Sequence, residues 1–303
     1  MSDHRISLGV VGLGRMGLPI ARRLAAAGYV TSGYDISAEA MRLAQESGIE
    51  GARSPGEIAG ATDATLVLVG SDTEVRHVVC EPDSGILAKA TAGHIVLIGS
   101  TVAPATSVAL AQAAEPQSVH VVDATLCRGE GPAADGTLLI LTGGPETVLE
   151  RVHDALGVLG SSIHRLGPVG AGQVGKMLNN YLLWLTVVGN FEAMRLAARM
   201  GVDLEVLRMA LLESSGANWA LETWHQSRPM PWAEKDMAIL LDCADRFRLP
   251  MVVAGTVREA IKQVKLDKNG AFGGEGTLRS MDEFVRLLEL QVFPEQSGDR
   301  ARE

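Results

Sequence analysis

Cysteine is scarce in this sequence, and the few cysteines lie far apart. The 303 residues include three, Cys80, Cys127 and Cys243, and no C-x-x-C pair. Zinc sites and disulfide frameworks need closely spaced or paired cysteines, so neither is indicated. The seven histidines are scattered as well, and we expect no metal site.

Long apolar runs and basic clusters are also missing. No uninterrupted apolar stretch reaches the roughly 20 residues that a membrane-spanning helix needs, and the short apolar segment after "MSDHR" is too short for a signal peptide. The net charge is −9 and no long Lys/Arg run is present. Because phosphate binding needs a basic patch, a nucleic-acid partner is disfavoured. We expect a cytoplasmic protein that binds neither membranes nor nucleic acids.

Aromatic residues make up only 4% of the chain, whereas hydrophobic residues in total reach 47%. The length predicts two domains at roughly 150 residues each. In the first half, apolar segments alternate with helical patterns, which predicts βαβ units and a mostly parallel sheet. The apolar segments show no in–out alternation, as expected of a sheet covered on both faces. The expected strands are 6–11, 29–35, 63–71, 94–101, 119–126, 137–144 and 161–170.

The pattern changes after residue 166, where no convincing strand appears. One long helical run begins at 172 and ends near 200, and shorter helical segments follow. We predict a sheet domain over 1–166, an all-α domain over 167–292 built on a long interdomain helix, and a polar tail over 293–303. The shorter helices are expected at 203–213, 233–247, 252–264 and 276–290.

A glycine motif lies directly between the first strand and the first helix. Gly12, Gly14 and Gly17 form G-x-G-x-x-G. The first glycine makes a tight turn, the second lets a pyrophosphate approach the backbone, and the third packs the helix on the strand. The helix N-terminus then meets the phosphates with its free N–H groups. The pattern predicts a Rossmann dinucleotide-binding domain, whose cofactor-binding loop is completed by Leu13, Arg15 and Met16.

Asp35 ends the second expected strand. A carboxylate there can accept hydrogen bonds from the adenosine ribose hydroxyls, and it repels the 2′-phosphate of NADP. The residue therefore favours NAD over NADP as the cofactor. Its alternative role is to cap the next turn.

Lys176 and Asn180 lie four residues apart, on one face of the long helix. Apolar and glycine neighbours disfavour the charged form of a lysine. Such a lysine can take a proton from an alcohol, or return one to a carbonyl. Taken alone, it also fits an ordinary helix lysine that reaches solvent.

Four motifs in a fixed order cover nearly the whole chain. They are "VGLGRMG" near the start, "GSTVAP" at 99–104, the G-x-x-G-x-G-x-x-x-K-x-x-N-N pattern at 167–180, and "KDMAILLDCA" at 235–244. Together they resemble the β-hydroxyacid dehydrogenase family, typified by 3-hydroxyisobutyrate dehydrogenase. The resemblance implies a nicotinamide cofactor between a Rossmann domain and a helical domain. It also implies Lys176 as general acid/base, with Asn180 assisting at the substrate.

The same resemblance assigns two further residues to the cofactor. Thr101 is expected near the nicotinamide end, and Lys235 is expected to close over cofactor and substrate. Without the family, Lys235 and Asp236 are a charge pair at a helix start, and Thr101 caps a strand end. We expect an NAD-dependent dehydrogenase that oxidises a β-hydroxy acid or related acidic alcohol, or reduces the corresponding aldehyde or ketone.

The segment "DATLCRGEGPAADGTL" at 123–138 departs from the family pattern D-A-P-V-S-G-G-x-x-G-A-x-x-G-T-L. In the family, the S-G-G turn holds the substrate carboxylate, and here Cys127, Arg128 and Gly129 occupy that turn. A thiol is a poor hydrogen-bond donor. The guanidinium of Arg128 can bind a carboxylate or sulfonate with two parallel bonds. Its alternative is to point to solvent or to pair with Glu130.

Three other departures are smaller. Thr125 stands where the family has Pro, Pro132 where it has Gly, and Ile98 where the D-x-S-T motif has Asp. Ile98 closes an expected strand, so its change is interpreted as structural.

Three tryptophans, Trp219, Trp224 and Trp232, precede Lys235. In the family this region borders the substrate pocket, so Trp219 is expected to wall it and the others to lie in a core or interface. With the altered turn, this predicts a bulkier substrate than hydroxyisobutyrate. The apolar helical half predicts a homodimer or homotetramer.

Other functions remain open. An imine or semialdehyde reductase of the same superfamily shares the fold, but imine reductases usually lack the lysine. A 6-phosphogluconate dehydrogenase is longer and has K-x-x-H-N, with histidine in place of Asn179. A cofactor-binding regulator or scaffold would have lost the chemistry, which the Lys176–Asn180 pair disfavours. A nucleophilic Cys127 needs an adjacent base, and none is evident.

Overall fold

The structure, a computed structural model, describes residues 6–29, 31–226, 228–229, 232–266, 272–273 and 277–278. The chain divides into two compact units, Met1–Met177 and Leu178–Glu303. The expected tail at 293–303 lies outside the described residues. The same holds for the helix expected at 276–290, except for 277–278, which form a strand.

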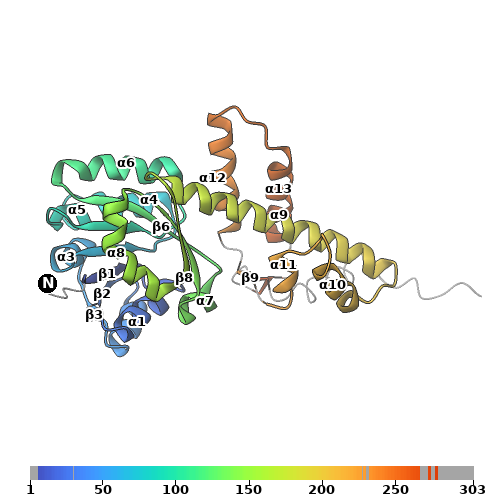
Figure 1. Ribbon diagram of the computed structural model, residues 1–303, viewed down its shortest axis with the longest axis horizontal. Helices are drawn as coiled ribbons and strands as arrows, with labels where there is room; N and C mark the ends of the chain where they lie inside the picture. Colours follow the sequence, from blue (N-terminus) through green and yellow to red (C-terminus); the bar gives the residue numbers. More distant parts are fainter. Residues whose placement is uncertain are drawn as a thin grey trace, which may run out of the picture. The chain divides into compact units, whose positions relative to one another are not determined.

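The first unit contains an eight-stranded sheet with the order β3-β2-β1-β4-β5-β6-β7-β8 (Figure 1). Every neighbouring pair is parallel except β6 with β7. The predicted α/β Rossmann architecture is therefore confirmed. The strands are β1 (Leu8–Val11), β2 (Thr31–Tyr34), β3 (Glu50–Gly51), β4 (Ala64–Val67), β5 (Ile95–Ile98), β6 (His120–Cys127), β7 (Leu138–Gly143) and β8 (Gly160–Gly167).

Helices cover both faces of this sheet (Figure 1). Serine side chains cap three of them: Ser37, Ser54 and Ser71 accept backbone N–H groups of α2, α3 and α4. Such caps satisfy donors that a helix start leaves unpaired. The helices are α1 (Gly17–Ala26), α2 (Ala38–Glu46), α3 (Pro55–Ala61), α4 (Asp72–Cys80), α5 (Ile86–Lys89), α6 (Pro104–Ala114), the 3-10 turn η1 (Glu115–Gln117), α7 (Glu130–Asp135), α8 (Glu146–Leu159) and the start of α9 (Ala171–Arg199).

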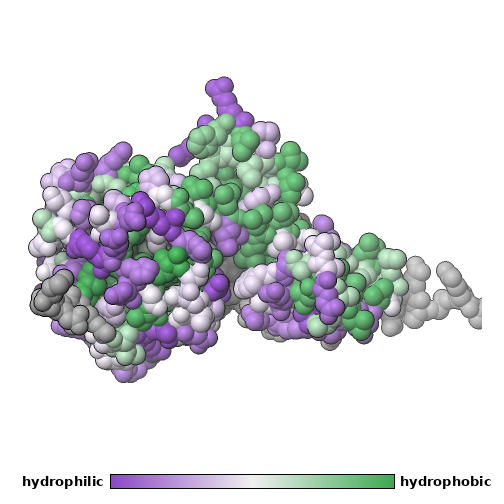
Figure 2. Space-filling view, viewed as in Figure 1, coloured by the Kyte–Doolittle hydropathy of each residue, from purple (hydrophilic) through white to green (hydrophobic). Residues whose placement is uncertain are grey.

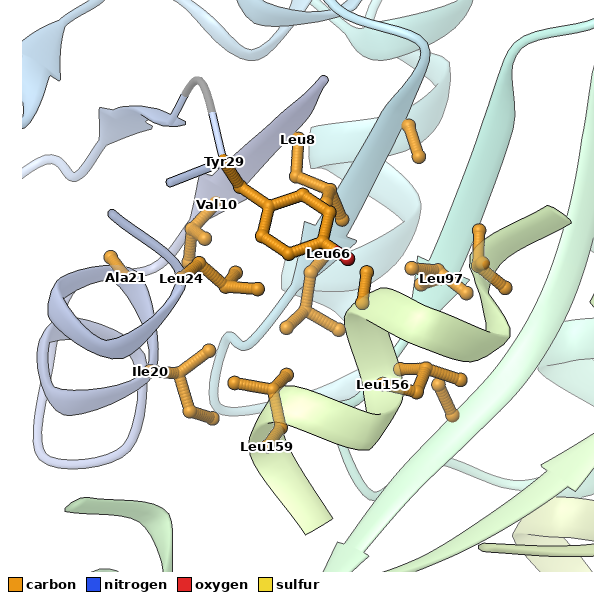
Figure 3. Packing of buried hydrophobic residues seen from close by; sticks show 14 of the residues in the cluster. Leu8, Val10, Ile20, Ala21, Leu24, Tyr29, Leu66, Leu97, Leu156 and Leu159 are labelled. Carbon is orange, nitrogen blue, oxygen red and sulfur yellow. The ribbon is translucent and has the colours of Figure 1, made fainter. Parts of the chain in front are cut away.

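The core of the first unit consists of two apolar layers, one on each face of the sheet. In one layer, Leu8 and Leu97 of the strands pack with Leu24 of α1 and Leu156 of α8 (Figure 3). The other layer contains the alternate strand residues, Val11, Val67, Val96 and Ile98. Because successive strand residues point to opposite faces, two buried faces need continuous apolar runs.

The second unit is mainly helical, as predicted. It contains the rest of α9, α10 (Leu204–Leu212), α11 (Trp219–Glu222), α12 (Ala233–Arg246) and α13 (Val252–Leu266). Three antiparallel strands, which were not predicted, are also present: β9 (Arg228–Pro229), β10 (Phe272–Gly273) and β11 (Thr277–Leu278). The expectation of no strand after residue 166 was wrong in this detail, because a two-residue strand has too few positions to show a period.

Candidate functional site

The glycine loop joins β1 to α1, and two of its three glycines stand where a side chain would clash with the backbone. Gly12 has a φ of +92°, and an added Cβ would lie 2.3 Å from the carbonyl oxygen of Leu68. At Gly17 an added Cβ would lie 1.8 Å from the carbonyl oxygen of Gly12, whereas Gly14 faces open space. This is the backbone geometry expected of a G-x-G-x-x-G turn before a helix N-terminus.

Asp35 ties this loop to the end of β2. Its Oδ2 accepts the N–H of Leu13 at 2.7 Å, and its Oδ1 accepts the N–H of Ser37 at 2.8 Å. The second bond caps the turn after β2, which was the alternative role considered for Asp35. The first places a carboxylate beside the glycine loop, where ribose recognition is predicted.

Lys176 lies in the second turn of α9 and is half-buried. Its Nζ donates to the carbonyl oxygen of Leu126 at 2.7 Å. Leu126 precedes the last residue of β6, so Lys176 Nζ lies where this strand ends. The carboxyl ends of parallel strands are the usual ligand-binding edge of such a sheet. The lysine therefore does not simply extend into solvent.

Two buried side chains fix the first turn of α9 to β6. The Oδ2 of Asp123 accepts the N–H groups of Gly170 at 2.6 Å and of Gly172 at 3.1 Å. The hydroxyl of Thr125 lies 3.1 Å from the carbonyl oxygens of both Leu141 and Gly172. The departure from the family's proline thus gives β6 a side-chain contact with α9.

The Asp123 carboxyl is fully buried, and this burial raises its pKa. Hydrogen bonds from the backbone N–H groups at the start of α9 act against this rise in the pKa. From the sequence, Asp123 was predicted only as part of the 123–138 motif, with no role of its own. Its importance could have been recognised from the sequence, because it places a carboxyl group inside the otherwise apolar strand "HVVDATLC".

The turn after β6 has an unusual backbone. Arg128 has a φ of +87° and Gly129 a φ of +86°. A non-glycine residue in such a conformation is strained by about 1–3 kcal/mol. The Nη1 of Arg128 donates to the carbonyl oxygen of Thr137 at 2.8 Å and to the hydroxyl of Ser161 at 3.1 Å. A φ of +87° at position 128 suits glycine, the residue of the family pattern there. In this chain the two hydrogen bonds of Nη1 hold the Arg128 side chain in place.

Glu130 pairs with Arg15 of the glycine loop, with Nε and Oε1 2.6 Å apart. The alternative of an Arg128–Glu130 pair is therefore wrong, because the Glu130 carboxylate is directed at the cofactor loop. This ion pair joins α7 to the loop that precedes α1.

Cys127 is buried, with 2% of its surface exposed. Burial raises the pKa of its thiol, and the positive charges of Lys176 and Arg128 counteract the rise only in part. A thiol with a raised pKa is a poor nucleophile. A covalent role for Cys127 is therefore not supported.

In the second unit, Asn180 and Lys235 share one partner, Asp236. The Nδ2 of Asn180 donates to Asp236 Oδ2 at 2.7 Å. The Nζ of Lys235 lies 3.3 Å from Asp236 Oδ1 and 5.7 Å from the centroid of the Trp232 ring. The expected charge pair at the start of α12 is thus present. Asp236 also orients Asn180, and this contact was not predicted from the sequence.

The remaining tryptophans differ in burial. Trp219 begins α11 and is 43% exposed, whereas Trp224 is 1% exposed. A core position for Trp224 is therefore confirmed. The substrate role of Trp219 remains a prediction.

Two family models match consecutive parts of the chain. Residues 7–167 match the NAD binding domain of 6-phosphogluconate dehydrogenase. Residues 170–277 match the NAD-binding domain of NADP-dependent 3-hydroxyisobutyrate dehydrogenase.

Individual relatives agree with these models. The NAD-dependent L-serine dehydrogenase of Pseudomonas aeruginosa is 34% identical over 73% of this chain and 72% of its own length. The human mitochondrial 3-hydroxyisobutyrate dehydrogenase is 33% identical over 74% of this chain and 66% of its own length. The crystal structure of a 3-hydroxyisobutyrate dehydrogenase from Salmonella typhimurium has a TM-score of 0.78 and 26% identity, covering 93% of this chain and 99% of its own.

The chain belongs to the β-hydroxyacid dehydrogenase family. It is an NAD-dependent dehydrogenase, and the 3-hydroxyisobutyrate dehydrogenase-like fold predicted from its motifs is confirmed. Among the described helices, none combines the length and apolarity required to cross a membrane.

Proposed function

We propose that this β-hydroxyacid dehydrogenase oxidises the hydroxyl of a β-hydroxy acid or related acidic alcohol, with Lys176 as general acid/base. The observation that supports the proposal is the position of Lys176 Nζ, 2.7 Å from the Leu126 carbonyl oxygen where β6 ends. Gly12, Leu13, Gly14, Arg15, Met16 and Gly17 would hold the pyrophosphate of NAD, and Asp35 the adenosine ribose.

Bound NAD supplies the hydride acceptor. The amine of Lys176 takes the hydroxyl proton in oxidation and returns it in carbonyl reduction. Asn180 hydrogen-bonds the substrate, and Asp236 holds its amide in one orientation. Thr101 and Lys235 contact the cofactor in this proposal.

The turn formed by Cys127, Arg128 and Gly129 is proposed to anchor the acidic group of the substrate, with Trp219 as a wall of the pocket. The Arg128 guanidinium has five donors, and its bonds to Thr137 and Ser161 both use Nη1. A bidentate bond to a carboxylate uses two N–H groups.

A screen of NAD reduction over hydroxy acids, sulfonates and neutral alcohols tests the function and the anchor together. The first compounds are 3-hydroxyisobutyrate and L-serine, which relatives are named for. We expect turnover of at least one hydroxy acid. Arg128→Gly should raise its KM by roughly tenfold, since a hydrogen bond to a charged group contributes about 1.5 kcal/mol. The KM of neutral alcohols should not change.

Arg22→Ala is the matched control, because it removes an equal charge from an arginine bonded to Ser47 on α1's surface. An equal response of all compounds to Arg128→Gly would remove Arg128 from the anchor. Failure to turn over any hydroxy acid would contradict the proposed function itself.

Asp35→Ala should lower the preference for NAD over NADP by about tenfold or more, because a charged acceptor for ribose hydroxyls contributes at least about 1.5 kcal/mol. The measurement is kcat/KM with each cofactor. Asp35→Asn serves as the control, since it can still accept the Leu13 N–H while losing the charge that repels a 2′-phosphate. An unchanged ratio in both variants would exclude Asp35 from the ribose site.

An imine or semialdehyde reductase is the second candidate, favoured only by the shared superfamily fold. The screen separates it by adding cyclic imines and semialdehydes with NADH. A regulator or scaffold would bind NADH without turnover of any compound.

We also propose a homodimer or homotetramer formed through the helical unit. Large apolar side chains are exposed on its helices, including Leu182, Leu196, Val206 and Val252. Figure 2 shows apolar surface gathered over α12 and α13. Monomers rarely leave extended apolar patches uncovered. A monomeric mass by light scattering would contradict this assembly.

A cytoplasmic location, consistent with a soluble NAD coenzyme, is proposed and is tested by cell fractionation.

A further inference from the structure

Gln173 lies one turn before Lys176 on α9 and is completely buried. Its Oε1 accepts the N–H of Val102 at 3.1 Å, and its Nε2 donates to the carbonyl oxygen of Ser100 at 2.9 Å. The side-chain amide therefore pairs with the backbone on both sides of Thr101. Gln173 was not among the site residues predicted from the sequence.

The segment that Gln173 holds is also fixed from its other side. The hydroxyl of Ser100 accepts the N–H of Val69 at 2.8 Å, and the carboxylate of Asp72 accepts the N–H of Ala103 at 3.0 Å. These bonds tie the segment to the region after β4. Gln173 supplies the corresponding tie to α9.

A glutamine amide suits this contact for a chemical reason. It is a neutral group that both donates and accepts, in one plane and at a fixed spacing. Moving α9 along or around the 100–102 segment would lengthen at least one of the two bonds. The contact therefore fixes the position of the helix as well as its distance.

We propose that Gln173 is a positioning residue of the dehydrogenase reaction, which sets the location of Lys176 relative to the backbone at Thr101. This rests on the proposed function, in which Lys176 moves the proton and Thr101 lies at the nicotinamide end. Hydride and proton leave neighbouring atoms of the substrate. The lysine that takes the proton and the backbone at the nicotinamide end must therefore keep a constant separation. A misplacement of about 1 Å can lower a rate by about 100-fold.

Gln173→Met tests the proposal, since methionine is close in size to glutamine but cannot make either bond. We expect kcat to fall by about 100-fold while the NADH dissociation constant, measured by fluorescence, stays within about threefold, because the pyrophosphate loop is untouched. The isotope effect on kcat with substrate deuterated at the carbinol carbon should rise, because chemistry becomes slower than product release. The Val102 amide should lose protection from hydrogen exchange.

Thr65→Val is the matched control. It removes another buried hydrogen bond of the same unit, from the Thr65 hydroxyl to the His94 ring at 3.0 Å. We expect it to lower Tm without changing kcat, the isotope effect or the exchange of Val102. If Gln173→Met fails to fold, Gln173→Asn replaces it, since the shorter amide cannot span both peptide groups.

The outcomes distinguish failure of the positioning role of Gln173 from failure of the proposed function. An effect of the Gln173 variant no larger than that of Thr65→Val on kcat and the isotope effect would overturn the positioning role. If the wild type turns over no hydroxy acid, the proposed function fails. Hydrogen exchange of the Val102 amide in Gln173→Met still tests whether Gln173 holds the 100–102 backbone. Unchanged protection of the Val102 amide in Gln173→Met would then refute the contact, and lost protection would support it.

Discussion

Alanine at position 176 is expected to lower kcat by about 10³-fold while leaving NADH affinity intact, since general acid–base catalysis contributes about 10²–10⁴-fold. The physical reason is that the substitution removes the group proposed to carry the hydroxyl proton, whose Nζ lies 2.7 Å from the carbonyl oxygen of Leu126 near the carboxyl end of β6. The glycine loop does not depend on this side chain. The measurement is kcat with the best hydroxy acid, together with NADH fluorescence titration.

Three further variants or additions sharpen this expectation. Lys176→Arg keeps the charge but cannot release its proton near neutral pH, so it should be as inactive as the alanine variant. Added primary amines should partly restore turnover to Lys176→Ala, in the order of their basicity. Lys89→Ala, at an exposed position of α5, should behave as wild type. Retained turnover in Lys176→Ala would remove the lysine from the mechanism.

The parts of the fold that local patterns determine were predictable. Continuous apolar strands, helical spacing and a G-x-G-x-x-G turn are each encoded within about a dozen neighbouring residues. The major strands of the first sheet and the long helix at 171–199 were therefore expected near their observed positions. β3 escaped prediction because its two residues, Glu50 and Gly51, are exposed and carry no apolar signal.

The contacts that arrange the site were not predictable, because they join residues far apart in the sequence. Gln173 contacts Val102, 71 positions away, and Asn180 contacts Asp236, 56 positions away. No local period encodes such pairs. The backbone of Arg128 was hidden for a different reason: an arginine gives no sign of a positive φ, which the sequence would have shown with glycine.

Asp123→Ala is expected to be the most destabilising single substitution discussed for the first unit. The carboxyl is fully buried, and its Oδ2 accepts two N–H groups at the start of α9. Removing it leaves the buried N–H groups of Gly170 and Gly172 without this acceptor, which should lower the free energy of unfolding by roughly 3 kcal/mol. Chemical denaturation measures the loss. Asp123→Asn retains an acceptor oxygen and should lose less.

The pH dependence of the same pair of proteins gives a second test, whose sign follows from burial. Because burial raises the pKa of Asp123 above its ordinary value of 3.8, the folded state keeps the carboxyl proton to a higher pH than the unfolded chain does. Its contribution to stability is therefore complete below pH 3.8 and is lost as pH rises through the folded pKa. The unfolding free energy of wild type minus that of Asp123→Asn should decline over this window. A difference that rises with pH would mean that the hydrogen bonds from the α9 backbone to the Asp123 carboxylate outweigh the effect of burial.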